Sequence, residues 1–204
     1  MMFINWKLRE INLKIVYYGP AFSGKTTTLE YIHAKTNPEL RGDLVKLKTR
    51  KERTVYFDFM QLELGRIKGL KPKFKLYTVP GQAIYGASRK LVLRGVDGVV
   101  YVVDSQWERL MANLETMRDL EENLLGLGYD PESFPFVLQF NKRDLPNIAP
   151  IELLRTQLGR DGVPCFASVA TQGIGVLDTL KAAINLVMTS ARQRATPDGR
   201  ADRE

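Results

Sequence analysis

The chain has 204 residues, of which 44% are hydrophobic and 26% are charged, an ordinary composition for a globular protein with room for one α/β domain. Its longest apolar run, 99–103, is too short to span a bilayer, and the N-terminus lacks an apolar segment of signal-peptide length. The single cysteine excludes an internal disulfide and fits a reducing compartment. We therefore expect a cytoplasmic protein with no membrane anchor of its own.

The net charge of +7 is unevenly distributed, because residues 41–94 hold fourteen Lys and Arg against four Asp and Glu. Such a basic segment could face nucleic acid, anionic lipid or an acidic protein. No nucleic-acid-binding motif accompanies the charge, so we expect no nucleic-acid partner. A solvated face that also attracts a nucleotide is the simpler interpretation.

The first predicted strand, 11–18, runs into residues 19–26, whose sequence GPAFSGKT fits the phosphate-binding pattern G-x-x-x-x-G-K-[ST]. A helix is predicted over 25–35. The glycines allow successive N–H groups to form an anion nest, and the helix N-terminus adds its positive dipole end. Lys25 is expected to reach the β- and γ-phosphates, and the Thr26 hydroxyl to ligate Mg²⁺. A turn that binds nothing is the alternative, but both flanking elements argue against it.

Residues 36–53 are polar, basic and without clear periodicity, which predicts a long functional or mobile loop. Strands follow at 54–64 and 71–79. The connection between them is too short for a crossover helix, so we expect an antiparallel hairpin at a sheet edge.

Strands and helices alternate through the rest of the chain. Further strands are predicted at 98–104, 135–141 and 164–169, and further helices at 85–94, 107–126, 150–158 and 175–194. This alternation predicts a six-stranded, mostly parallel sheet flanked by helices. Residues 1–194 then form one domain of the P-loop α/β class, and 195–204 form a disordered tail.

A second motif, Asn141-Lys142-Arg143-Asp144, follows the predicted strand 135–141, about 115 residues after the P-loop. The Asp144 carboxylate could accept hydrogen bonds from the N1–H and 2-amino groups of guanine. Adenine offers neither donor, and a site built on such bonds rejects the wrong base by roughly 10⁴-fold. Asn141 would fix the base edge and the Lys142 stem would cover its face. The expected ligand is a guanine nucleotide.

Together with Thr54 and Pro80-Gly81-Gln82, these motifs resemble a small Ras-like GTPase. Segments 9–12, 14–20, 76–82, 87–91 and 140–146 are similar to the MglA family, bacterial Ras-like GTPases of cell polarity and gliding motility. The resemblance covers about residues 1–190.

The resemblance implies a Ras-like G domain that binds GTP or GDP with Mg²⁺ and hydrolyses GTP slowly unless an activating protein assists. It implies a homodimeric activator of the roadblock/LC7 fold, effectors that read the nucleotide state, and recruitment to a pole or membrane by partners. We expect the chain alone to be monomeric.

The resemblance also assigns roles to single residues. Gln82 would orient the attacking water, and Thr54 would sense Mg²⁺ and the γ-phosphate. Arg53 would act as an arginine finger in cis, with Arg50 and Lys51 as competitors, and Lys25 would stabilise charge. The backbone N–H of Ala170 would meet the guanine 6-oxo group. The remaining expected nucleotide contacts are Gly19, Ala21, Phe22, Ser23, Gly24, Thr27, Gly81, Lys142 and Val169.

Three positions depart from the family pattern. Thr78 stands where most Ras-like proteins place a magnesium-holding aspartate, and Asp58 in the adjacent strand is a candidate substitute. Ala21 replaces a P-loop glycine, which predicts normal binding but slow hydrolysis because the methyl could crowd the transition state. Residues 83–85 are less bulky than in the family, which could alter partner choice.

Two other functions are compatible with the sequence. A guanine-nucleotide-binding scaffold without appreciable hydrolysis would account for Ala21 and Thr78. A small-molecule kinase would account for the P-loop but would leave Asn141 to Asp144 unexplained.

Overall fold

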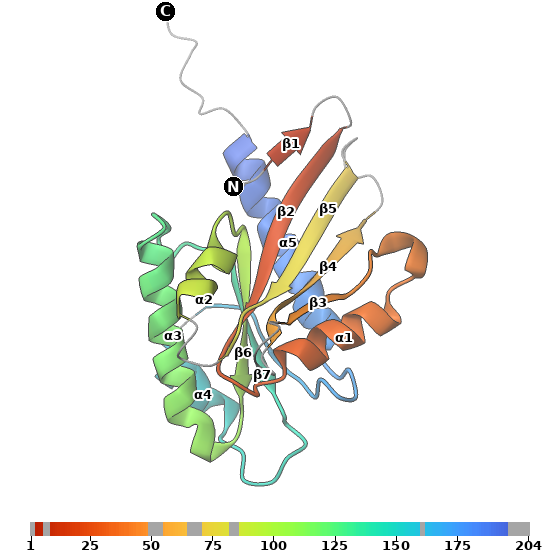
Figure 1. Ribbon diagram of the computed structural model, residues 1–204. Coiled ribbons are helices and arrows are strands. Elements are labelled where there is room, and N and C mark those ends of the chain that lie inside the picture. The colour runs from red at the N-terminus through yellow and green to blue at the C-terminus, as the bar shows by residue number, and fades with distance from the viewer. Residues whose placement is uncertain are drawn as a thin grey trace, which may run out of the picture.

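The computed structural model describes residues 3–5, 9–48, 55–64, 71–81, 86–159 and 162–195. Within these ranges one sheet has the order β3-β4-β5-β2-β6-β7-β8, and β1 pairs with β2 (Figure 1). The strands are β1 (Phe3–Asn5), β2 (Glu10–Tyr18), β3 (Val45–Lys48), β4 (Val55–Glu63), β5 (Lys71–Thr78), β6 (Gly98–Asp104), β7 (Phe136–Asn141) and β8 (Cys165–Ala167).

The helices begin and end close to the predicted boundaries. They are α1 (Lys25–Lys35), α2 (Gly86–Leu93), α3 (Leu110–Leu125), α4 (Ile151–Gln157) and α5 (Val176–Ala195), with short 3₁₀ turns η1 (Pro38–Leu40) and η3 (Trp107–Arg109). None of the helices in the described ranges is both long enough and apolar enough to cross a bilayer.

The sheet is parallel from β5 through β2, β6 and β7 to β8, and antiparallel from β5 to β4 to β3. This confirms the mostly parallel α/β class and the antiparallel β4–β5 pair. The prediction of six strands was too low, because the described residues include β1 and β3 as well. The β4–β5 pair is also not the edge, since β3 pairs with the outer side of β4 within the segment expected to be a loop.

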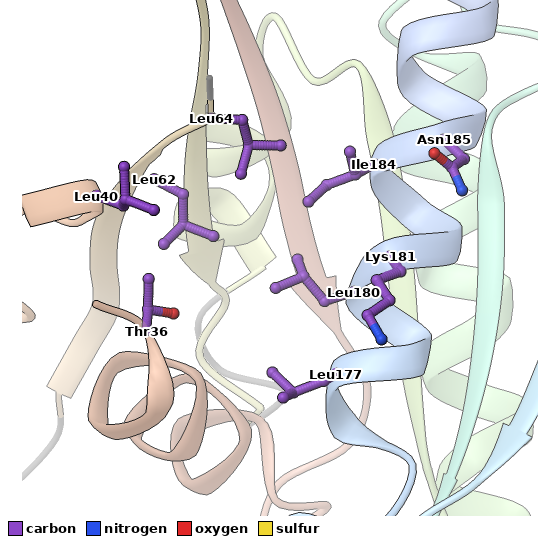
Figure 2. Close-up of a pocket in the computed structure, with 9 residues that line it drawn as sticks. All are labelled: Thr36, Leu40, Leu62, Leu64, Leu177, Leu180, Lys181, Ile184 and Asn185. Carbon is purple, nitrogen blue, oxygen red and sulfur yellow. The ribbon is translucent and has the colours of Figure 1, made fainter. Parts of the chain in front are cut away.

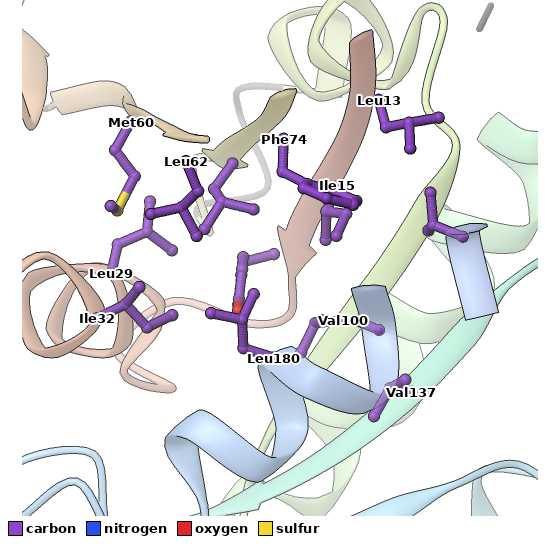
Figure 3. Packing of buried hydrophobic residues seen from close by; sticks show 14 of the residues in the cluster. Leu13, Ile15, Leu29, Ile32, Met60, Leu62, Phe74, Val100, Val137 and Leu180 are labelled. Carbon is purple, nitrogen blue, oxygen red and sulfur yellow. The ribbon is translucent and has the colours of Figure 1, made fainter. Parts of the chain in front are cut away.

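Helices cover both faces of the sheet (Figure 1). On one face, α1 and α5 contribute Leu29, Ile32 and Leu180 to a core with residues of the central strands such as Ile15 and Phe74 (Figure 3). On the other face, side chains of α2, α3 and α4 pack against the alternate strand residues. Every residue of β6 is buried, as expected for a central parallel strand covered on both faces.

The parallel strands end at one edge of the sheet, and the two predicted motifs follow β2 and β7 there. The loops after β5, β6 and β8 leave the same edge. Ligands of open α/β sheets bind beyond the carboxyl ends of the strands, so the topology brings these five segments to one site.

Candidate nucleotide-binding site

At two positions of the P-loop between β2 and α1, the backbone conformation and its surroundings can be accommodated only by glycine. Gly19 and Gly24 have φ values of 140° and 101°. A Cβ on Gly19 would lie 2.3 Å from the Val102 carbonyl oxygen, and one on Gly24 would lie 2.2 Å from Nδ2 of Asn141. Helix α1 starts at Lys25 without a side-chain cap, so no side chain occupies the N–H groups of its first turn. This loop can therefore present backbone donors to an anion.

Lys25 is buried beneath the P-loop and folds back on it. Its Nζ donates to the carbonyl oxygens of Gly19 at 2.8 Å and Pro20 at 2.6 Å. Burial, and next the positive charge of Arg89, lower the pKa of Lys25 to about 7, although Asp58 opposes the shift. An anionic phosphate beside Nζ would raise this pKa again, so the site favours an anion.

Three side chains from α1, β4 and β5 meet beside the end of the P-loop. Asp58 Oδ2 accepts hydrogen bonds from Thr26 Oγ1 at 2.6 Å and Thr78 Oγ1 at 2.9 Å, and the Asp58 N–H donates to Thr78 Oγ1 at 2.8 Å. Asp58 is 1% exposed, and its Oδ1 has no hydrogen-bond partner among the described residues. A carboxylate with a spare oxygen beside two hydroxyls is a donor set suited to a hard cation such as Mg²⁺.

A pocket of about 210 Å³ lies between the P-loop and the loops after β7 and β8. Asp144 lines it, is exposed, and has no ion pair or hydrogen bond with any described residue that would occupy its carboxylate. The predicted contacts that line this pocket are Phe22, Gly24, Thr27, Asn141, Lys142, Asp144, Val169 and Ala170. The structure therefore brings both motifs to one cavity.

Asn141 joins the three loops around that pocket. Its Nδ2 donates to the Ser23 carbonyl oxygen at 2.8 Å, and its Oδ1 accepts from the N–H of Ala170 at 2.9 Å and from Ser168 Oγ at 3.2 Å. The side chain is 2% exposed. The Ala170 N–H is thus already engaged, and a base oxygen would have to share it.

The segment after β5 lies directly against the P-loop. A Cβ on Gly81 would lie 2.4 Å from Cα and 2.5 Å from N of Ala21. Only glycine can therefore bring its backbone this close to the P-loop. The predicted catalytic residues Gln82 and Arg53, the switch residue Thr54, and the competitors Arg50 and Lys51 lie outside the described residues, as do 83–85.

Three further residues support the site and were not predicted. Asp104, fully buried at the end of β6, accepts from Lys142 Nζ at 2.7 Å. The Arg109 guanidinium donates to the Ala21 carbonyl oxygen at 2.8 Å, and the Asn113 carboxamide bonds to the backbone of Asp104. A charged residue closing an otherwise apolar strand was the available signal for Asp104, whereas Arg109 depends on how α3 packs.

A separate apolar hollow of about 390 Å³ lies between β4 and α5, away from both motifs (Figure 2). Leu62 and Leu64 face Leu180 and Ile184 across it. Lys181 is the one charged residue among the described residues that line it, and none of the residues of the two motifs does, so we separate this hollow from the nucleotide site.

A profile of the ADP-ribosylation factor family matches residues 1–195. The mutual gliding-motility protein MglA of Myxococcus xanthus (strain DK1622) is 53% identical over 193 residues, which cover 95% of this chain and 99% of that protein. The chain belongs to the MglA family of small Ras-like GTPases. Ras-related protein Rab-7a of Dictyostelium discoideum is 25% identical over 173 residues, or 82% of this chain and 78% of that protein.

Proposed function

We propose that this protein is a molecular switch that binds GTP and GDP and slowly hydrolyses GTP. The observation that carries the proposal is the exposed, unengaged carboxylate of Asp144 in the pocket beside the P-loop. Among the common bases, only guanine offers two adjacent donors to such a carboxylate. Phe22 and Gly24 of the P-loop line the same pocket, and the phosphates of that nucleotide would extend from it toward the P-loop N–H groups and Lys25.

In the proposed reaction the residues mainly hold and stabilise charge, since phosphoryl transfer needs little covalent help from the protein. The P-loop amides and Lys25 bind the phosphates. Gln82 orients the attacking water, and Arg53 stabilises charge from the segment before β4. The last two roles come from the family resemblance.

Mg²⁺ fits the donor set found here, because Asp58 keeps one buried oxygen without a partner beside the Thr26 hydroxyl. When bound, the ion would neutralise charge developing on the phosphates. We assign Thr26 and Asp58 as its protein ligands, with Thr54 as a further ligand in the GTP state. Asp58 thereby takes the place of the aspartate that Thr78 replaces.

The proposed switch acts through partners. GTP would order the segments near 36–60 and 80–90, and hydrolysis would release them. A homodimeric roadblock/LC7 protein would accelerate hydrolysis, and effectors would bind the GTP form. Since the Myxococcus relative is named a gliding-motility protein, we place the role in motility or cell polarity, with partners bringing a cytoplasmic protein to its site.

One contact favours the alternative of a scaffold that binds GTP without appreciable hydrolysis. Gly81 lies against the backbone of Ala21, and this close approach is compatible with a methyl at residue 21 that crowds the attacking water. We retain slow hydrolysis as the proposal, and phosphate release separates the two.

The base preference is tested with Asp144→Asn. The asparagine side-chain oxygen can still accept a hydrogen bond from N1–H of the base. Its NH₂ group, however, cannot accept from the 2-amino group of guanine, whereas it can donate to the 2-oxo group of xanthine. Affinity for GTP should fall by about 10³-fold or more while affinity for XTP rises. Glu108→Gln, another exposed carboxylate, should leave both affinities unchanged. An unaltered GTP-to-XTP preference in Asp144→Asn would refute the assignment.

A further inference from the structure

Arg109 reaches from the turn before α3 to the tip of the P-loop. Its Nη2 donates to the carbonyl oxygen of Ala21 at 2.8 Å, across 88 residues of sequence. The side chain is 30% exposed, so the stem is largely held by its surroundings. Among the described residues, no other donor forms a hydrogen bond with the Ala21 carbonyl oxygen.

The peptide unit whose carbonyl oxygen accepts the hydrogen bond from Arg109 also carries the N–H of Phe22. In a trans peptide the C=O and N–H groups point in opposite directions. Arg109 holds the Ala21 carbonyl on the side of α3, and the Phe22 N–H therefore points away from α3. Phe22 has φ of 65° and a ring that is 80% exposed, so its left-handed backbone is not held by burial of its own side chain. A turn hydrogen bond from the Ser23 N–H to the Pro20 carbonyl oxygen, at 3.3 Å, spans this peptide unit, and the contact of Arg109 holds it from a second side.

Arg109 is in turn anchored by a buried carboxylate that the guanine loop shares. Asp104 Oδ2 lies 3.7 Å from Arg109 Nε and 2.7 Å from Lys142 Nζ. Asp104 cannot easily move, because its N–H donates to Asn113 Oδ1 at 3.0 Å and its carbonyl accepts from Asn113 Nδ2 at 2.8 Å. A continuous chain of contacts thus connects Lys142 at the base pocket with the P-loop tip.

We propose that Arg109 is a positioning residue for GTP hydrolysis, which aims the Phe22 amide at the phosphates by holding the Ala21 carbonyl. The proposal rests on the proposed function of this site. Preorganised donors act where charge develops in the transition state, so a misdirected amide should slow the reaction more than it weakens nucleotide binding. Through Asp104, the same arginine ties the orientation of the phosphate loop to the loop that reads the base.

The test compares Arg109→Met with Arg118→Met, an exposed arginine of α3 with no contact to the P-loop. Single-turnover hydrolysis at saturating GTP, GTP affinity and the ³¹P spectrum of the bound nucleotide are measured for both and for the parent chain. We expect Arg109→Met to hydrolyse about tenfold more slowly, to bind GTP within about threefold of the parent, and to shift the β-phosphorus resonance. Arg118→Met should match the parent in all three.

Arg109→Lys separates positioning from a merely structural role, because its amine can still donate to the Ala21 carbonyl. Recovery of at least half the lost rate and of the ³¹P shift supports the proposal, even if Arg109→Met melts at a lower temperature. A hydrolysis rate in Arg109→Met equal to that of the parent overturns it. So does a slow rate that Arg109→Lys fails to restore. A parent chain that neither binds GTP nor releases phosphate would instead refute the proposed function.

Discussion

Residue 21 is the P-loop position against which the segment after β5 packs. The Ala21 backbone lies against Gly81, the residue before Gln82, to which we assign the attacking water, so the Ala21 methyl could crowd the transition state. We predict that Ala21→Gly raises single-turnover GTP hydrolysis by about tenfold, which corresponds to about 1.4 kcal/mol of barrier. GTP affinity should remain within about twofold, since the P-loop amides are unchanged. An unchanged hydrolysis rate would show that crowding is not what limits turnover.

Asp58 is the residue through which metal binding can be examined. Replacement by Asn retains the shape and an acceptor for Thr26 and Thr78 but removes the negative charge that a hard cation requires. The Mg²⁺ concentration that half-maximally slows mant-GDP release should rise by about tenfold or more in Asp58→Asn. Glu63→Gln in the same strand is the control and should behave like the parent. Equal magnesium dependence in the parent and Asp58→Asn would exclude Asp58 as a ligand.

At the scale of elements, the sequence was most informative where chemistry and local geometry coincide. The P-loop and Asn141 to Asp144 were found because a strand must end before each and because their residue types have few other uses. Strand β3 was missed because Val45–Lys48 is short, alternates with lysines and is stabilised only by pairing with β4. Its strand character arises from tertiary contacts.

The contacts of Arg109 and Asp104 that support the site could not be predicted from the sequence, because they too depend on tertiary packing. The contact between Arg109 and Asp104 depends on the turn that η3 makes between the end of β6 and the start of α3. Nothing in the spacing of these residues specifies the Ala21 carbonyl as a partner. Likewise, the role of Asn141 in joining three loops depends on where β7 and β8 place them.

A partly buried ion pair connects helix α2 to helix α3. Arg89 Nη1 lies 3.1 Å from Asp119 Oδ2, and the Tyr18 hydroxyl from β2 donates to the same carboxylate. Asp119→Asn should lower the free energy of unfolding by about 1–2 kcal/mol, because the buried guanidinium loses a negatively charged partner while Tyr18 keeps an acceptor. Urea denaturation provides the measurement.

A matched exposed pair distinguishes this effect from general charge removal. Asp178 and Lys181 in α5 are 3.4 Å apart with side chains 64% and 73% exposed. Asp178→Asn should therefore change the stability by less than about 0.5 kcal/mol. If the two variants lose equal stability, the α2–α3 pair has no special role.

At the scale of the whole molecule, the last turns of α5 complete the fold. Ala191 is 1% exposed in the core, and Arg194 Nη2 lies 3.3 Å from Oδ1 of the buried Asp97. Because these contacts lie within 1–195, we predict that a chain ending at residue 195 unfolds within about 0.5 kcal/mol of the full chain. A chain ending at residue 190 loses both contacts and should be about 2 kcal/mol less stable. A large loss on removing only 196–204 would contradict the domain boundary.

In the proposed function one site both recognises guanine and hydrolyses GTP, and nucleotide competition followed by phosphate release tests both properties together. Displacement of mant-GTP by GTP, GDP and ATP is measured in Mg²⁺, and phosphate release is then followed in the same sample. We predict displacement by GTP and GDP but not by ATP, followed by phosphate release at roughly 10⁻⁴ to 10⁻² per second. Equal displacement by ATP, or no phosphate release even with a roadblock/LC7 protein present, would contradict the account.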